Sequence, residues 1–297
     1  MPDWGLYLQA SLGSMVASAV VVFLSGWLGR PAAALRTSAG GIFALGVGLA
    51  SGYLILRFAW VWPPVKGLDR LLELVLPAAL AIEFAAAMPR VSRRLAWCLR
   101  IGLAALTGPV LLHGSVYLRY DRPEWTMPVA AGTLLGVGLL LVLTWLLLDR
   151  LAQRSSGVSI GVALSMATQC AGATIMLAGY IKGGMAAGPL AATIAATAIA
   201  SSLMKNRAAM QSTIGVALVG LSGLLLIGRF YGGLRTPGAL VTFCAPLLCW
   251  ATEIRAMRNW KPWQVCALQL TLVAIVLTSL LVLAKRDFDR DFGPLLR

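Results

Sequence analysis

The chain has 297 residues, of which 59% are hydrophobic and 12% charged, and its mean hydropathy is +0.82. Soluble globular domains carry about 25% charged residues, so this composition excludes an ordinary soluble domain and predicts a single membrane domain over residues 1–297. The net charge of +14 predicts no nucleic-acid partner, because Lys and Arg fall mainly in short loops and span ends, where they meet lipid phosphates.

Ten apolar runs of 20 to 24 residues follow one another along the chain. Each is about the 20 residues that a helix needs to cross a bilayer. None shows the alternating hydrophobicity of a membrane β-barrel strand. The predicted fold class is therefore all-α, a polytopic integral membrane helix bundle of about ten transmembrane helices. The runs are 8–28, 38–58, 69–88, 95–118, 127–148, 158–181, 185–204, 212–231, 237–257 and 263–284.

The stretch 157–204 contains two of these runs and a single charge, Lys182. The joint Lys182-Gly183-Gly184 is short enough to predict a tight turn, so the two runs form a hairpin. Small residues recur every four positions on both runs, which lets helix backbones approach closely in lipid. This pattern predicts that the hairpin forms the centre of the bundle. Shorter rows of the same kind include Gly40, Ala44, Gly48 and Gly52, then Gly132 and Gly136, then Gly215 and Gly223.

The ten runs divide into two possible halves, 1–150 and 151–284, followed by a polar C-terminal tail, 285–297. An odd number of spans in each half would make the two repeats inverted, as in many secondary transporters. Pro109 and Pro246 interrupt the fourth and ninth runs, which correspond between the halves. This layout resembles the drug/metabolite transporter superfamily in span count and length. The resemblance implies small-solute transport, and it carries no residue role over, because no family motif is matched.

The distribution of cations predicts the orientation. Loops and span ends after odd-numbered runs carry twelve Lys and Arg residues, against six after even-numbered runs. The positive-inside rule therefore places the first set in the cytoplasm and both termini outside. Four cations in the C-terminal tail oppose this assignment. We expect the protein in the inner membrane of a bacterial cell, with the lipid bilayer as its main partner.

No motif of a soluble enzyme is present. The five cysteines form no CxxC pair, and the chain has one histidine, so neither a metal site nor a cofactor is predicted. Ionisable groups inside a bilayer are costly and need an explanation. The third and fourth runs contain four of them, which are Glu73, Glu83, Arg100 and His113.

In an antiparallel hairpin, residues at equal depth have a nearly constant sum of position numbers. Glu83 with Arg100 gives 183 and Glu73 with His113 gives 186, a mismatch of about 4.5 Å of helix rise. Each glutamate thus has a basic counterpart at its own level, and an ion pair between Glu83 and Arg100 is predicted. These charges either neutralise one another within the bundle or form a site that handles a proton or a substrate.

Two prolines lie near the deeper pair. Pro77 cannot donate to the carbonyl of Glu73, and Pro109 lies four residues before His113. We expect Glu73 and His113 to line a polar pocket against the 157–204 hairpin. The competing interpretation is that Glu73 pairs with Arg70 near the interface.

Two amides also lie inside predicted spans, Gln169 in the sixth and Gln269 in the tenth. Each either hydrogen-bonds a neighbouring helix or contacts a substrate. Three functions remain open. The leading one is secondary transport of a small solute, coupled to protons through Glu73 or Glu83. The alternatives are a membrane scaffold or assembly subunit without catalysis, and an intramembrane enzyme, which the lack of a catalytic set disfavours.

Overall fold

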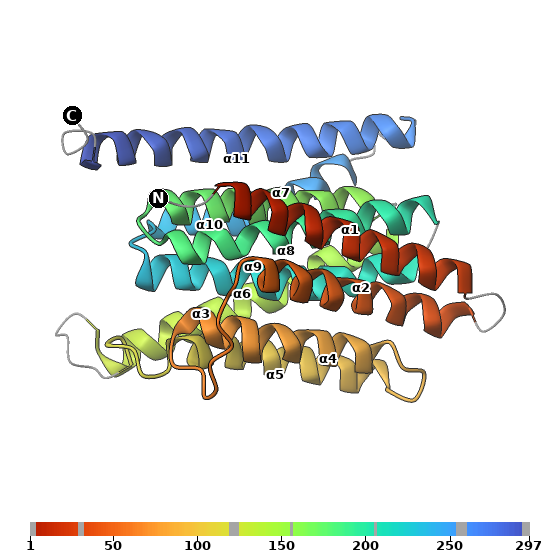
Figure 1. Cartoon of the computed structure of the whole chain (residues 1–297), viewed down its shortest axis with the longest axis horizontal. Coiled ribbons are helices and arrows are strands. Elements are labelled where there is room, and N and C mark those ends of the chain that lie inside the picture. Colours follow the sequence, from red (N-terminus) through yellow and green to blue (C-terminus); the bar gives the residue numbers. More distant parts are fainter. Residues whose placement is uncertain are drawn as a thin grey trace.

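The computed structural model describes residues 4–28, 33–118, 125–154, 157–204, 207–253 and 260–292. Every regular element in these ranges is a helix, and the helices run along one long axis with their connections at its two ends (Figure 1). The first five are α1 (Trp4–Leu28), α2 (Ala33–Ile55), α3 (Gly67–Arg70), the π-helical turn η1 (Leu71–Val75) and α4 (Leu76–Ala86). They are followed by α5 (Arg93–Leu112), α6 (Met127–Arg154), α7 (Val158–Leu177), α8 (Ile181–Leu203), α9 (Arg207–Tyr231), α10 (Thr236–Cys244), the 3₁₀ helix η2 (Ala245–Glu253) and α11 (Pro262–Phe292).

Seven of the described helices are long and apolar enough to cross a membrane: α1, α5, α6, α7, α8, α9 and α11. The other three predicted runs correspond to α2 and to two interrupted helices. In α2 the apolar stretch within the fully described residues is Ala39–Ile55, while the third run is divided among α3, η1 and α4, and the ninth between α10 and η2. The chain is thus a helical, membrane-embedded protein, while the full count of ten spans is not confirmed.

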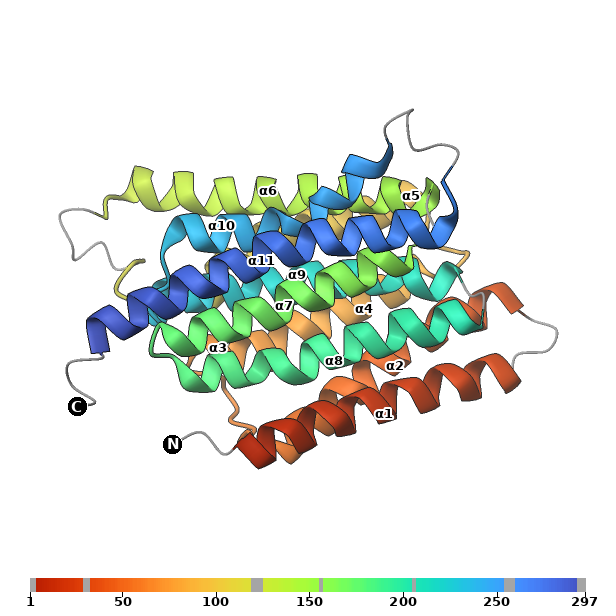
Figure 2. The ribbon, with the colours of Figure 1, turned by 90° about the horizontal axis from the view of Figure 1, so that it is seen from above.

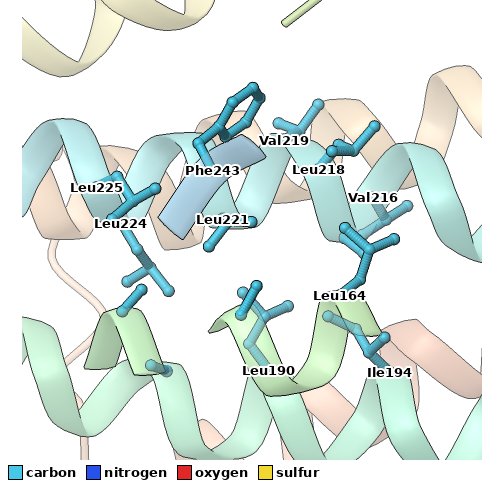
Figure 3. Packing of buried hydrophobic residues seen from close by; sticks show 14 of the residues in the cluster. Leu164, Leu190, Ile194, Val216, Leu218, Val219, Leu221, Leu224, Leu225 and Phe243 are labelled. Atoms are coloured by element: carbon cyan, nitrogen blue, oxygen red, sulfur yellow. The ribbon is translucent and has the colours of Figure 1, made fainter. Parts of the chain in front are cut away.

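The most enclosed helix is α9. Its residues 212–228 are all buried, and α2, α4, α5, α6, α7 and α8 pack against it. A helix that is apolar around its whole circumference is stable only when other helices surround it or lipid does. Figure 3 shows the contact at close range: Val216 and Leu221 of α9 face Leu164 of α7 and Leu190 of α8. The hairpin at 157–204 therefore lies beside the central helix, and the prediction that it forms the centre is only partly right.

Small residues bring the helices close together, as their spacing predicts. A Cβ added to Gly172 of α7 would lie 2.5 Å from the Cβ of Ala187 on α8, and one added to Gly161 would lie equally close to Ala198. The same device joins α2 to α1, where a Cβ on Gly48 would lie 1.9 Å from the Ser18 hydroxyl. Together, α1, α2 and α8 form one edge of the bundle, and α6 lies at the opposite edge (Figure 2).

The turn inside the hairpin lies earlier than predicted. The chain reverses at Ala178–Tyr180, and Lys182, Gly183 and Gly184 belong to the first turn of α8. Gly179 explains the difference, because its φ of +92° suits glycine and ends α7. The Tyr180 N–H donates to the Ile175 carbonyl at 3.1 Å and the Gly179 N–H to the Met176 carbonyl at 3.0 Å, which together form a Schellman motif.

The fourth predicted run also ends early. Helix α5 stops at Leu112, six residues before the predicted end at Leu118, and His113 lies outside the helix with ψ 133°. Gly114, with φ +70°, follows immediately and turns the chain away. The apolar residues beyond it made the run look longer, because hydropathy does not register a change of backbone direction.

Candidate functional site: a polar cavity around a buried ion pair

The site is built where α4 ends and α5 begins. Ser92 caps α5 by accepting a hydrogen bond from the Leu95 N–H at 3.2 Å, and this fixes the start of the helix. Glu83 lies three residues before the last residue of α4, and Arg100 lies seven residues after the first residue of α5. Because α4 and α5 are antiparallel neighbours, both side chains lie within about 10 Å of the same end of the bundle.

Glu83 and Arg100 form a bidentate ion pair. Arg100 Nε donates to Glu83 Oε1 and Arg100 Nη2 to Glu83 Oε2, each at 2.8 Å. The exposed fraction is 1% for the Glu83 side chain and 14% for the Arg100 side chain. The ion pair predicted from sequence depth is therefore confirmed. Two parallel charge-assisted hydrogen bonds also fix the direction in which the guanidinium faces.

Two tryptophans hold the guanidinium of Arg100. Its carbon lies 5.2 Å from the ring centre of Trp97 and 5.3 Å from that of Trp145, within the range of cation–π attraction. Gly215 of α9 makes the arrangement fit. A Cβ there would lie 2.3 Å from Trp145 Cζ2 and 2.7 Å from Glu83 Oε1. Helices α4, α5, α6 and α9 thus meet at this pair.

A polar cavity of about 300 Å³ surrounds the exposed side of the pair. It contains two carboxylates and two guanidiniums, since Asp149 of α6 and Arg93 of α5 also line it. Gln153 Nε2 donates to Asp149 Oδ2 at 3.0 Å, one turn further along α6. The complete lining is Glu83, Ala86, Ala87, Val91, Arg93, Ala96, Trp97, Arg100, Asp149, Gln153, Gln211 and Ser212.

Apolar side chains close the cavity toward the middle of the bundle. One turn deeper than Glu83 lies Ala79, one turn deeper than Asp149 lies Trp145, and one turn deeper than Ser212 lies Val216. All three are buried, with exposed fractions of 2% or less. The cavity therefore reaches the charged pair from one end of the bundle only.

Sequence reasoning found the ion pair and missed the rest of the lining. Asp149 lies just beyond the predicted end of the fifth run at Leu148, so it is not among the charged residues predicted to lie inside a span. In the structure α6 continues to Arg154, which places Asp149 and Gln153 on the helix. Their spacing of four residues, which puts two side chains on one helix face, was the available signal.

Glu73 lies elsewhere, in the π-helical turn η1. The Leu76 N–H donates to the carbonyl of Leu71, five residues back, just before Pro77. The missing N–H of Pro77 explains why the regular pattern breaks here. Glu73 Oε1 accepts a hydrogen bond from the Val61 N–H at 3.0 Å. Its other oxygen is buried and has no hydrogen-bond partner in the part of the chain that the structure describes.

His113 and Glu73 are not brought into contact by any hydrogen bond or ion pair between described residues. The His113 side chain is exposed at the end of α5, and its carbonyl accepts a hydrogen bond from Arg70 Nη1. Arg70 Nε donates to the Pro64 carbonyl at 3.2 Å, so Arg70 bonds backbone groups and forms no ion pair with Glu73. Neither Glu73 nor His113 lines the polar cavity. Their joint role in proton transfer stays a prediction.

The two amides both bond neighbouring helices. Gln269 of α11 is 1% exposed, and its Nε2 donates to the Cys249 carbonyl at 2.9 Å and to Thr252 Oγ1 at 2.6 Å. Gln169 of α7 donates from Nε2 to the hydroxyl of Tyr7 on α1 at 2.6 Å. Neither lines the polar cavity, and both contacts fit the role of interhelical hydrogen bonds.

Comparison with known proteins returned no matching family, no matching curated protein and no matching solved structure. The likeness of layout to the drug/metabolite transporters therefore stays a prediction, and the function has to be argued from the cavity itself.

Proposed function

We propose that this protein is a secondary transporter of a small polar solute, and that the cavity around Glu83 and Arg100 is its solute-binding site in a state open to one side. The observation that carries the proposal is the pair itself: a bidentate ion pair, nearly inaccessible at Glu83, that forms the floor of a polar cavity. Charges inside a membrane domain are costly, and they are commonly found where a substrate or ion is handled.

The lining favours a solute with both signs of charge. Glu83 and Asp149 offer two negative groups, and Arg93 and Arg100 offer two positive groups, so their formal charges cancel. Gln153, Gln211 and Ser212 add groups that form hydrogen bonds. A cavity of about 300 Å³ is at the lower limit of ligand pockets. A zwitterion of amino-acid size fits these properties better than a large or singly charged molecule.

The proposal includes a ten-span topology. The ten helical segments correspond to the ten predicted runs, and successive segments run in opposite directions (Figure 1). The cavity then opens at the end that carries the larger number of cations, which the positive-inside rule assigns to the cytoplasm. We place the protein in the bacterial inner membrane on the same reasoning. Glu83 is the carboxylate through which a proton would couple to transport.

The test begins with binding. The purified protein is heated with a panel of zwitterionic, cationic, anionic and neutral solutes of amino-acid size, and the unfolding temperature is recorded. We expect at least one zwitterion to raise the unfolding temperature of the wild type and of Arg235→Gln, a control at a surface ion pair. The double variant Glu83→Gln/Arg100→Gln, which removes both charges together, should show no shift.

Uptake of the same solute into liposomes containing the protein then distinguishes transport from binding alone. We expect uptake by the wild type and the control variant, a loss of at least tenfold in the double variant, and dependence on a pH gradient. Equal uptake by the double variant would rule out this cavity as the transport site.

A further inference from the structure

A second cavity lies between α6 and α10, with α9 as its floor. Its volume is about 240 Å³. It is separate from the polar cavity, with which it shares no lining residue. Nine of its thirteen lining residues are apolar. The lining is Trp125, Thr133, Val137, Leu140, Ser222, Leu225, Leu226, Arg229, Phe230, Thr236, Ala239, Leu240 and Phe243.

Three side chains that can donate hydrogen bonds lie at one end of this cavity. Arg229 lies two residues before the last residue of α9, Thr236 is the first residue of α10, and Trp125 lies two residues before α6 begins. Arg229 Nε donates to Thr236 Oγ1 at 2.7 Å. The positive end of the α10 helix dipole lies at Thr236 as well, which adds to the attraction for an anion.

Two donors at this end remain available. Trp125 Nε1 is buried and has no hydrogen-bond partner among the described residues. Arg229 is exposed and pairs with no carboxylate in the described chain, whereas the nearby Arg235 pairs with Asp287 at 3.1 Å. A buried donor without an acceptor costs free energy, so a ligand oxygen placed there would be stabilised.

The rest of the cavity is mainly apolar and extends toward the middle of the bundle, and the Thr133 hydroxyl there donates to the Val129 carbonyl of its own helix at 2.8 Å. From Arg229 to Ser222, and from Thr236 to Phe243, the lining covers seven residues of helix, or about 10 Å. The Ser222 hydroxyl donates to the Val219 carbonyl of its own helix at 2.9 Å and so offers no free donor. Leu240, at the outer wall, is 47% exposed, on the surface that faces lipid.

An aromatic cluster stands beside the polar end. The rings of Tyr117, Trp125 and Phe230 pack edge to face, with centroid distances of 4.9 to 5.6 Å. Aromatic rings of this kind gather at the level of lipid headgroups. The cavity thus has cationic and aromatic groups at headgroup level and an apolar groove below them.

We infer that this cavity binds one acyl chain of an anionic phospholipid, whose phosphate lies against Arg229 and Trp125. The order of groups along the cavity matches the order along a lipid, from charged head to apolar tail. The volume of about 240 Å³ is below that of a pocket for a whole drug-sized ligand, so it encloses part of one chain while the rest of the lipid stays in the bilayer. This inference is independent of the proposed transport function.

The experiment uses the full-length protein, delipidated in detergent and offered equal amounts of phosphatidylglycerol and phosphatidylcholine. Native mass spectrometry then counts the retained lipids. We expect one phosphatidylglycerol to be retained at least tenfold better than phosphatidylcholine. Ala239→Phe, which fills the cavity, should lose this retention at least tenfold, and Arg229→Gln should remove the preference for phosphatidylglycerol.

Val241→Phe is the matched control, because Val241 lies on the same helix, is 42% exposed and does not line the cavity. It should retain lipid like the wild type. Lipids with brominated acyl chains supply a second readout, since they should quench the fluorescence of the wild type more than that of Trp125→Phe.

Three outcomes would overturn the inference: an unchanged preference for phosphatidylglycerol in Arg229→Gln, unchanged retention in Ala239→Phe, or displacement of the lipid by inorganic phosphate alone. The last would identify the ligand as a free anion.

Discussion

The most demanding residue-level feature is the ion pair of Glu83 and Arg100. Removing two charges from water is costly, and a close, bidentate geometry offsets this cost only while both partners are present. The two tryptophan rings near Arg100, Trp97 and Trp145, add attraction without adding a charge. The pair therefore behaves as a unit, and its members should not be replaceable one at a time.

A double-mutant cycle tests this. We expect Glu83→Gln alone to lower the free energy of unfolding by about 3–5 kcal/mol, because Arg100 is left without its partner. Glu83→Gln together with Arg100→Gln should cost less than the single change. The measurement is unfolding in mixed micelles with increasing denaturing detergent. Arg235 and Asp287, with side chains 69% and 38% exposed, supply the control cycle, whose coupling should be at most about 1 kcal/mol. Additive losses at Glu83 and Arg100 would refute the coupling.

Gly215 gives a second residue-level prediction. Gly215→Ala places a methyl group 2.3 Å from Trp145 Cζ2 and 2.7 Å from Glu83 Oε1, which the ion pair holds in place. Overpacking of this kind costs about 1–3 kcal/mol, so the variant should unfold at a lower temperature. Gly136→Ala is the control, since no atom lies within 4 Å of its added Cβ and alanine favours the helix by up to about 1 kcal/mol. Thermal unfolding should separate the two, and equal stability would contradict the packing described at Gly215.

At the scale of elements, the ninth run shows how a broken helix is held inside the bundle. Helix α10 stops at Cys244, and η2 continues in a 3₁₀ conformation across Pro246. Backbone groups freed by such a break need partners at membrane depth. Gln269 of α11 supplies two contacts, to the Cys249 carbonyl and the Thr252 hydroxyl.

We therefore predict that Gln269→Leu lowers the free energy of unfolding by about 1–2 kcal/mol, near the upper end of the range for interhelical hydrogen bonds in membranes. Gln169→Leu should cost less, because Gln169 is exposed and makes one such bond, to Tyr7. Unfolding in mixed micelles compares the two variants directly. A larger loss for Gln169→Leu would show that burial at η2 is not what gives Gln269 its effect.

The existence of each helical segment was predictable from the sequence, because a long apolar run in lipid has few options other than a helix. The ends of the segments were less predictable. Gly179 ends α7 and Gly114 follows α5, while the adjacent apolar residues concealed both stops. Gly183 and Gly184 looked like the turn and instead permit close packing, since a Cβ on Gly184 would lie 2.6 Å from the Gly172 carbonyl oxygen.

At the scale of the molecule, contacts between helices that are adjacent in the sequence could be predicted, whereas contacts with the helices packed around them could not. Equal depth in one hairpin was enough to join Glu83 with Arg100, because a short loop fixes the register of two helices. The same argument did not bring Glu73 into contact with His113, since α5 ends before His113. No local sequence pattern predicts that α9 lies at the centre or that Asp149 lies near the ion pair, because both depend on how helices distant in sequence pack together.

The whole-molecule prediction concerns topology. If all ten segments cross the membrane, the connection between α4 and α5 and the connection between α9 and α10 lie on opposite sides. The larger number of cations lies on the side of the α4–α5 connection, so Arg94 should face the cytoplasm and Arg235 the exterior. Reporter fusions after each residue, using one reporter active inside the cell and one active outside, measure this directly. Opposite compartments with Arg94 inside would place the opening of the polar cavity in the cytoplasm. The same compartment for both would mean that an even number of segments crosses between them instead of the five expected, and the ten-span topology would have to be abandoned.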